Sequence, residues 1–100
     1  MISRNAFDAS LTVAVPPSGL SIPLLALWWE KKGHWDHAHE LVNELESNDA
    51  MAVHAHLHRR EGDHSNAGYW YRRAGRNYFR DDLDEEWQTL VDAMLSGAGN

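Results

Sequence analysis

Two glycines, Gly33 and Gly62, each separate two stretches whose apolar residues recur with the period of an α-helix. The order of elements is therefore helix, glycine corner, helix, and it occurs twice at an offset of 29 residues. An alanine follows five residues after each glycine, at Ala38 and Ala67, where a small side chain lets two helices cross closely. Neither helical hairpin can bury its apolar face alone, so the sequence predicts an all-α fold in which the hairpins stack.

Helix boundaries follow from local signals. The sequence predicts four helices in the two hairpins, over residues 23–32, 35–46, 50–61 and 64–78. A fifth helix is predicted over residues 83–94. Ser21 can cap the first helix, with Pro23 in its first turn, and Asp63 can cap the fourth. Gly75 weakens the last turns of the fourth helix. Residues 82–85 resemble a capping box, which begins the fifth.

The second glycine corner has a recognisable pattern, Gly62-Asp63-x-x-x-Ala67-x-x-Trp70-Tyr71-x-x-Ala74. This pattern resembles the tetratricopeptide and Sel-one-like repeats, and the resemblance covers about residues 22–80. It implies a right-handed superhelix of two hairpins followed by a capping helix. Because such repeats are generic scaffolds, the resemblance also implies an interaction role without naming a partner.

Residues 1–20 differ from the rest of the chain. Leu11, Val13 and Val15 alternate with smaller residues, a period of two that is typical of a short strand, and Pro16-Pro17 ends the pattern. No second strand is evident to pair with it. We therefore expect an extended N-terminal arm over residues 1–20 and a single helical domain over residues 21–96.

The composition limits the classes of protein to which the chain can belong. The chain has 100 residues, 43% of them apolar, which suits one domain with a modest core. It has no cysteine, so disulfides and thiolate metal sites are excluded. The formal charge of −6 does not favour nucleic-acid binding. No apolar run approaches the roughly 20 residues of a membrane span, and no targeting signal is evident, so we expect a cytoplasmic protein without a membrane partner.

The histidines of the third predicted helix suggest a metal site. His54 and His58 are four residues apart and so share one helix face, whereas His56 points away from them. Two histidines at this spacing can begin a zinc site if a third ligand comes from elsewhere. His39 on the preceding helix is the natural candidate. The alternative is that these histidines flank the core and form hydrogen bonds to carbonyl or carboxylate groups.

A second group of polar and aromatic residues suggests ligand binding. Tyr69 and Arg73 share one helix face, and Arg72 and Arg76 share another. Near Glu61 and Asn66, these residues could form a pocket for a carboxylate or phosphate. The alternative is a solvated helix face with weak ion pairs. Trp35, if exposed, would mark a partner surface. The candidate binding residues are Trp35, His54, His58, Glu61, Asn66, Tyr69, Arg72 and Arg73.

Catalytic signatures are missing from the sequence, which has no cysteine nucleophile, no GxSxG and no glycine-rich phosphate loop. We expect a non-catalytic module that binds a protein or peptide partner, with a homodimer as one option and no cofactor. The alternative is a small metal-binding protein or enzyme, with zinc as the cofactor, that uses His39, His54 and His58 together with Glu61.

Overall fold

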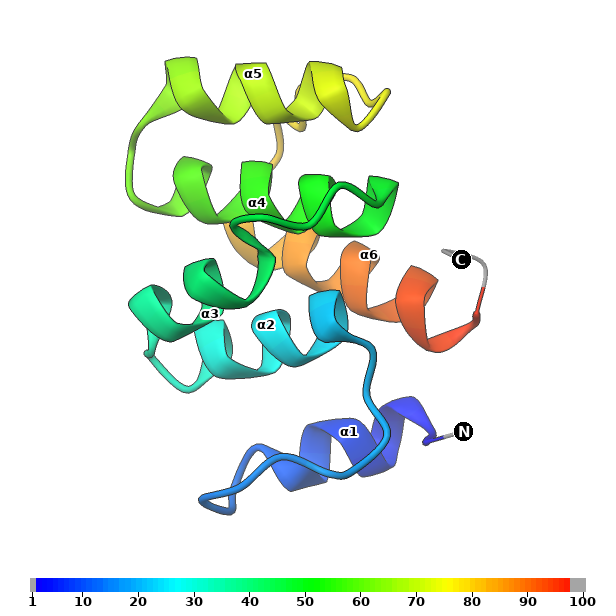
Figure 1. Ribbon diagram of the computed structural model, residues 1–100. Coiled ribbons are helices and arrows are strands. Elements are labelled where there is room, and N and C mark those ends of the chain that lie inside the picture. Colours follow the sequence, from blue (N-terminus) through cyan, green and yellow to red (C-terminus); the bar gives the residue numbers. More distant parts are fainter. Residues whose placement is uncertain (1, 98–100) are drawn as a thin grey trace.

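The computed structural model describes residues 2–97 and is all-α over that range, which confirms the predicted fold class (Figure 1). Six helices are present among these residues: α1 (Arg4–Ser10), α2 (Ile22–Lys31), α3 (Trp35–Val42), α4 (Asn48–Arg60), α5 (His64–Arg73) and α6 (Leu83–Leu95). Within the same range, no helix has the length and apolar character needed to cross a bilayer. The right-handed superhelix implied by the repeat resemblance stays a prediction.

The two predicted hairpins are present as α2–α3 and α4–α5, which lie one above the other (Figure 1). Gly33 and Gly62 have φ angles of 92° and 87°, in the left-handed region that glycine adopts without a steric penalty. Ala38 and Ala67 are both fully buried, as expected for residues at close helix crossings. The offset of 29 residues in the sequence therefore corresponds to a repeated structural unit.

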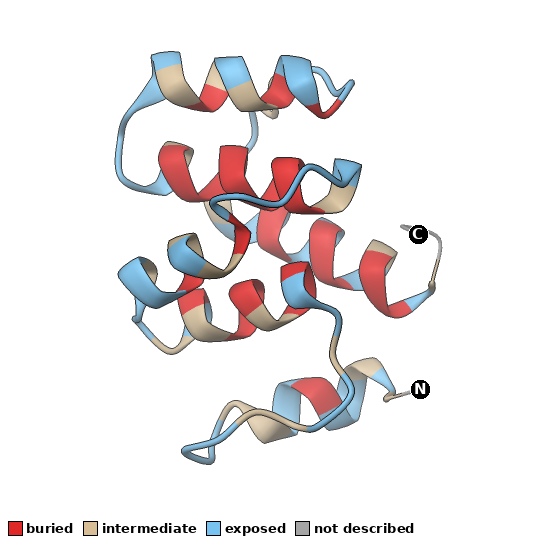
Figure 2. Ribbon diagram, viewed as in Figure 1, coloured by how far each residue is buried: buried red, intermediate tan, exposed pale blue. Residues whose placement is uncertain are grey.

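Helix α4 lies at the centre of the fold and contacts α2, α3, α5 and α6. All residues from Ala50 to His58 are buried, so nearly every face of the helix lies in an interface (Figure 2). The buried stretch includes three histidines, His54, His56 and His58. Buried polar side chains need hydrogen-bond partners, so the neighbours of these three rings determine what the centre of the protein can do.

Helix α6 covers α2 and α4 on the side away from α3 (Figure 1). Its start is set by Asp82, whose carboxylate accepts the backbone N–H of Glu85. Trp87 is almost fully buried, and its indole Nε1 donates to the carbonyl of Leu27 at 2.9 Å. This helix therefore brings an acidic residue, Glu86, into the interior beside α4.

The prediction of an extended arm is wrong for Arg4–Ser10, which form α1, and residues 11–15 form turns rather than a strand. Ser3 caps α1 by accepting the N–H of Ala6. Phe7 is fully buried, with its ring 6.1 Å from that of Trp87, so a contact distant in sequence stabilises this short helix. Residue 1 of the predicted arm lies outside the described residues.

Two helices are shorter than predicted. Helix α3 ends at Val42 instead of residue 46, because residues 43–46 are exposed and gain no burial from another turn. Helix α5 ends at Arg73, and Gly75 at φ 71° closes it, with the N–H of Arg76 donating to the carbonyl of Tyr71. The glycine that weakens the predicted helix is therefore the point at which it ends.

Candidate functional site

Three imidazoles, those of His39 on α3 and of His54 and His58 on α4, converge between the two hairpins. We call them the His cluster. One ring nitrogen of each lies within 4.8 Å of one ring nitrogen of the others, and the Nε2 atoms of His39 and His54 are 3.1 Å apart. His54 and His58 are buried, whereas His39 is partly exposed. The sequence predicted this combination of residues as a metal site, and the fold brings all three together.

The separation of His39 and His54 in the His cluster is close to that of two metal ligands. Two imidazoles bonded to a tetrahedral zinc ion at about 2.0–2.1 Å stand about 3.3–3.4 Å apart. The 3.1 Å separation of His39 and His54 needs almost no adjustment to fit this value. It also suits an N–H···N hydrogen bond, so this pair alone does not identify a metal site. The third imidazole favours a metal site over a simple hydrogen bond, because one hydrogen bond needs only two imidazoles.

Protonation favours metal binding. Burial, together with the smaller effects of the neighbouring His58 and His39, lowers the pKa of His54 to about 3. Burial also lowers the pKa of His39, and the neighbouring His58 adds to this effect. Both rings are therefore neutral at pH 7 and carry the lone pair that a metal ion requires. Nδ1 of His54, the ring nitrogen that does not face His39, is buried without a hydrogen-bond partner among the described residues.

Glu61 orients the third imidazole. Nδ1 of His58 lies 2.6 Å from Oε2 of Glu61, which accepts its hydrogen bond. With a proton on Nδ1, the lone pair of neutral His58 is on Nε2, the nitrogen left for a metal ion. A carboxylate that holds a ligand histidine in this way is a common feature of metal sites. His58, Glu61 and Asp63 also lie close enough to form a separate group of potential ligands, but both carboxylates are exposed.

Two tryptophans frame the His cluster. Trp35 stacks on His39, with ring centroids 4.9 Å apart and planes within 8°, and its Nε1 donates to the carbonyl of Leu57 at 2.7 Å. Trp70 on α5 stacks on His54 at 4.0 Å and 17°. These contacts hold the rings in place and limit the access of water. Trp35, predicted as a binding residue, therefore packs against the His cluster and is only partly exposed.

His56 faces the opposite side of α4, as predicted, and lies between two buried carboxylates. Its Nε2 is 2.7 Å from Oε2 of Glu30 on α2, and its Nδ1 is 2.7 Å from Oε1 of Glu86 on α6. Burial opposes a charge on the ring, but the hydrogen bonds and negative charges of the two carboxylates outweigh burial and raise the pKa of His56. The ring is thus an imidazolium that donates from both nitrogens.

Two arginines and a tyrosine complete the interactions of these carboxylates. Arg59 donates to Oε1 of Glu86 at 3.0 Å, Arg60 donates to Oε2 of Glu30, and the hydroxyl of Tyr71 donates to Oε2 of Glu86. Burial, followed by the hydrogen bond to Glu86, raises the pKa of Tyr71. We call Glu30, His56, Arg59, Arg60 and Glu86 the charge network. It links α2, α4 and α6 and is separate from the His cluster.

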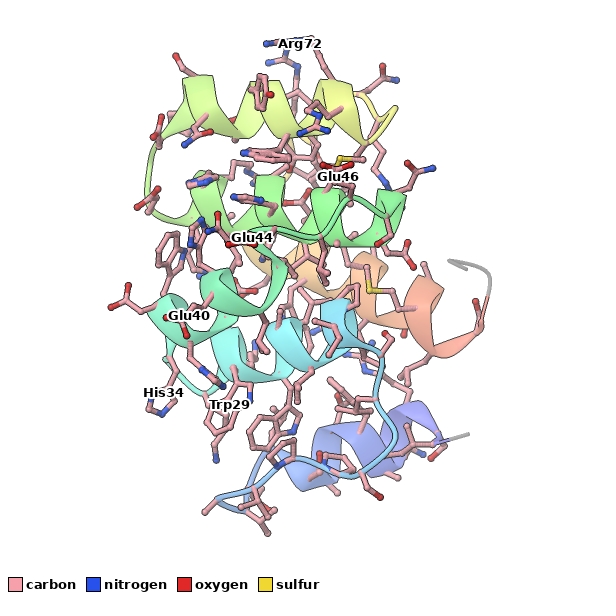
Figure 3. All side chains as sticks on the ribbon, viewed as in Figure 1. Trp29, His34, Glu40, Glu44, Glu46 and Arg72 are labelled. Carbon is pink, nitrogen blue, oxygen red and sulfur yellow. The ribbon has the colours of Figure 1, made fainter. Side chains whose placement is uncertain are left out.

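The remaining predicted binding residues lie on or near α5. Asn66 donates its backbone N–H to Asp63, and Arg73 lies over the rings of Tyr69 and Trp70. Tyr69 is 48% exposed. Arg72 extends from α5 away from the other helices (Figure 3).

The charge network was not predicted. Glu30 and Glu86 were not among the residues predicted to form a site. One signal was available for Glu30, since it follows Trp28 and Trp29 in the most apolar helix of the chain. A carboxylate there has to be buried with a partner or placed at the helix end. Its partners, His56 and Arg60, could not be identified without knowing how α2 packs against α4.

Comparison with models of protein families, with curated proteins and with solved structures found no match to this chain.

Proposed function

We propose that this protein binds a divalent transition-metal ion of the zinc type through His39, His54 and His58. The observation that carries the proposal is the convergence of three imidazoles from two helices, with one nitrogen of each within 4.8 Å of the others. Nitrogen ligands without thiolates suit zinc, copper or nickel rather than magnesium or calcium. Three protein ligands also leave one position of a tetrahedral ion for water or a small ligand.

The test is metal binding by protein purified without an affinity tag. We expect one zinc ion per chain, measured by elemental analysis and by competition with a chromophoric chelator, and a melting temperature that falls when the metal is removed. His39→Ala is the preferred variant because His39 is partly exposed and its loss disturbs the core least. His37→Ala, an exposed histidine of the same helix, is the matched control.

Two outcomes would overturn the proposal. One is the absence of stoichiometric metal together with no change in melting temperature on adding zinc or chelator. The other is equal zinc affinity in His39→Ala and His37→Ala. Circular dichroism of both variants shows whether a loss of binding reflects a loss of folding.

A second function, binding of a protein or peptide partner in the cytoplasm, is favoured by the outer surface of α5. Tyr69 is exposed there, with Arg73 over its ring, and Arg72 extends outward from the same helix (Figure 3). This surface is basic on an otherwise acidic chain and suits an acidic partner, which includes a second copy of the chain. Loss of partner binding in Tyr69→Ala, with zinc affinity unchanged, would separate this function from the metal site.

A further inference from the structure

A cavity of about 290 Å³ lies on the other side of α4 from the His cluster, between α4, α6 and the segment that joins α5 to α6. Ala52 on α4, Leu90 on α6 and Phe79 of the joining segment give it apolar walls. Its volume is at the lower end of the range of small-molecule sites, which are mostly apolar with a few convergent polar groups. Its polar lining includes one buried place, with Glu86 and Tyr71, and one exposed place, with Arg76 and Asn77.

The first polar place is Glu86, whose side chain is 3% exposed. Oε1 of Glu86 accepts hydrogen bonds from His56 and Arg59, and Oε2 accepts one from the hydroxyl of Tyr71. A carboxylate has about four acceptor positions, so Oε2 retains one. Glu86 and Tyr71 both line the cavity. Because His56 and Arg59 offset the negative charge, this carboxylate presents a hydrogen-bond acceptor without strongly repelling an anion.

The second polar place consists of Arg76 and Asn77, two exposed residues that also line the cavity. The one carboxylate of the described residues within 4 Å of the Arg76 guanidinium is that of Asp49, whose Oδ1 is 3.9 Å away and therefore beyond hydrogen-bonding distance. The guanidinium thus has donors to spare. Together with the amide of Asn77 it can bind a carboxylate, for which the planar fork of arginine is well suited.

We infer that this cavity binds a small carboxylate with an apolar body and a hydroxyl or amino group at its far end. Its carboxylate pairs with Arg76 and Asn77, its body contacts Ala52, Phe79 and Leu90, and its hydroxyl or amino group donates to Oε2 of Glu86. Binding requires no metal ion. The inference goes beyond the proposed metal function and does not depend on it.

The probe is 4-hydroxyphenylacetate, which has a carboxylate and a hydroxyl at opposite ends of a ring. Binding is followed by amide chemical shifts of the full chain in the presence of chelator, with Ala52 and Leu90 as reporters. We expect millimolar or tighter binding that shifts both reporters. Phenylacetate, which lacks the hydroxyl, and 4-hydroxybenzyl alcohol, which lacks the carboxylate, should each bind on the order of tenfold more weakly.

The matched variants are Arg76→Gln and Arg72→Gln, both at exposed arginines, of which only Arg76 lines the cavity. Arg76→Gln should weaken binding of 4-hydroxyphenylacetate about tenfold and leave that of 4-hydroxybenzyl alcohol unchanged, whereas Arg72→Gln should change neither. Absence of shifts at Ala52 and Leu90 at millimolar probe would overturn the inference. Equal effects of the two variants would overturn it as well. Since chelator is present throughout, these outcomes are independent of the zinc titration.

Discussion

Replacement of His56 by leucine tests whether the interior of this protein depends on a buried positive charge. The imidazole is fully buried, and each of its nitrogens lies 2.7 Å from a carboxylate oxygen, one of Glu30 and one of Glu86. Leucine fills a similar volume but donates no hydrogen bond and carries no charge. The substitution therefore removes both interactions while creating only a small change in packing.

The loss of unfolding free energy can be estimated from the hydrogen-bond partners that each carboxylate retains in the variant. Among the described residues, Glu86 keeps Arg59 and Tyr71 as partners, but Glu30 keeps only Arg60, and its Oε1 has no partner even with His56 present. Removing one partner of a buried ion pair costs about 3–5 kcal/mol of unfolding free energy. In a domain of this size each kcal/mol lowers the melting temperature by about 4–8 °C, so we expect a decrease of about 12–40 °C.

The assay is urea unfolding at pH 7, followed by tryptophan fluorescence and circular dichroism. His37→Leu serves as a control because His37 is exposed. A second variant combines Glu30→Gln with His56→Leu and should recover part of the lost stability, because it removes the carboxylate that is left least satisfied. If His56→Leu proves as stable as the natural protein, the imidazole is a neutral part of the core and the reasoning fails. If the double variant recovers nothing, the cost does not arise at Glu30.

Three further predictions concern α1, pH and Glu61. Phe7→Ala should lower the free energy of unfolding by about 3–5 kcal/mol, because a fully buried ring is lost; a decrease below about 1 kcal/mol in urea titration would contradict the docking of α1. With chelator present, the stabilisation by His56 should be complete below its unfolded pKa of about 6.5 and should be lost as pH rises through its raised folded pKa. A difference in stability between the natural protein and His56→Leu that stays constant from neutral to alkaline pH would exclude this linkage. Glu61→Ala should weaken zinc binding about 10–100-fold. Glu44→Ala, at an exposed residue between α3 and α4 (Figure 3), is the control and should leave zinc binding unchanged. Equal zinc affinities of the two variants would show that Glu61 does not support the site.

The parts of the structure that could be predicted from the sequence are those with local causes. The glycine corners, the caps and the shared face of His54 and His58 depend on residues within one or two helical turns. The approach of His39 followed from its position in the preceding hairpin, since consecutive helices of such a stack are neighbours. The opposite orientation of His56 was predicted correctly because it depends only on the spacing of residues along one helix. The partners of His56 were not predicted.

The parts that could not be predicted depend on where α6 packs. Helix α1 has a weak local signal, and its burial rests on the contact of Phe7 with Trp87. The charge network needs Glu30 and Glu86, which lie 26 and 30 residues from His56. No periodicity or spacing indicates which buried histidine such carboxylates will meet. The pairing becomes visible only when the three helices are placed in space.

The position of α6 also determines when the protein can fold during its synthesis. The hydrogen bond from Trp87 to the carbonyl of Leu27 joins residues 60 apart, and the ion pair between Arg4 and Asp92 joins residues 88 apart. The two hairpins contain mostly local contacts and can form while the chain is still emerging from the ribosome, because local contacts close quickly. The apolar face of α2 and α4, with Glu30 and His56 on it, stays uncovered until residues 83–95 arrive. The nascent chain is therefore most vulnerable to misassembly immediately before its sixth helix is made.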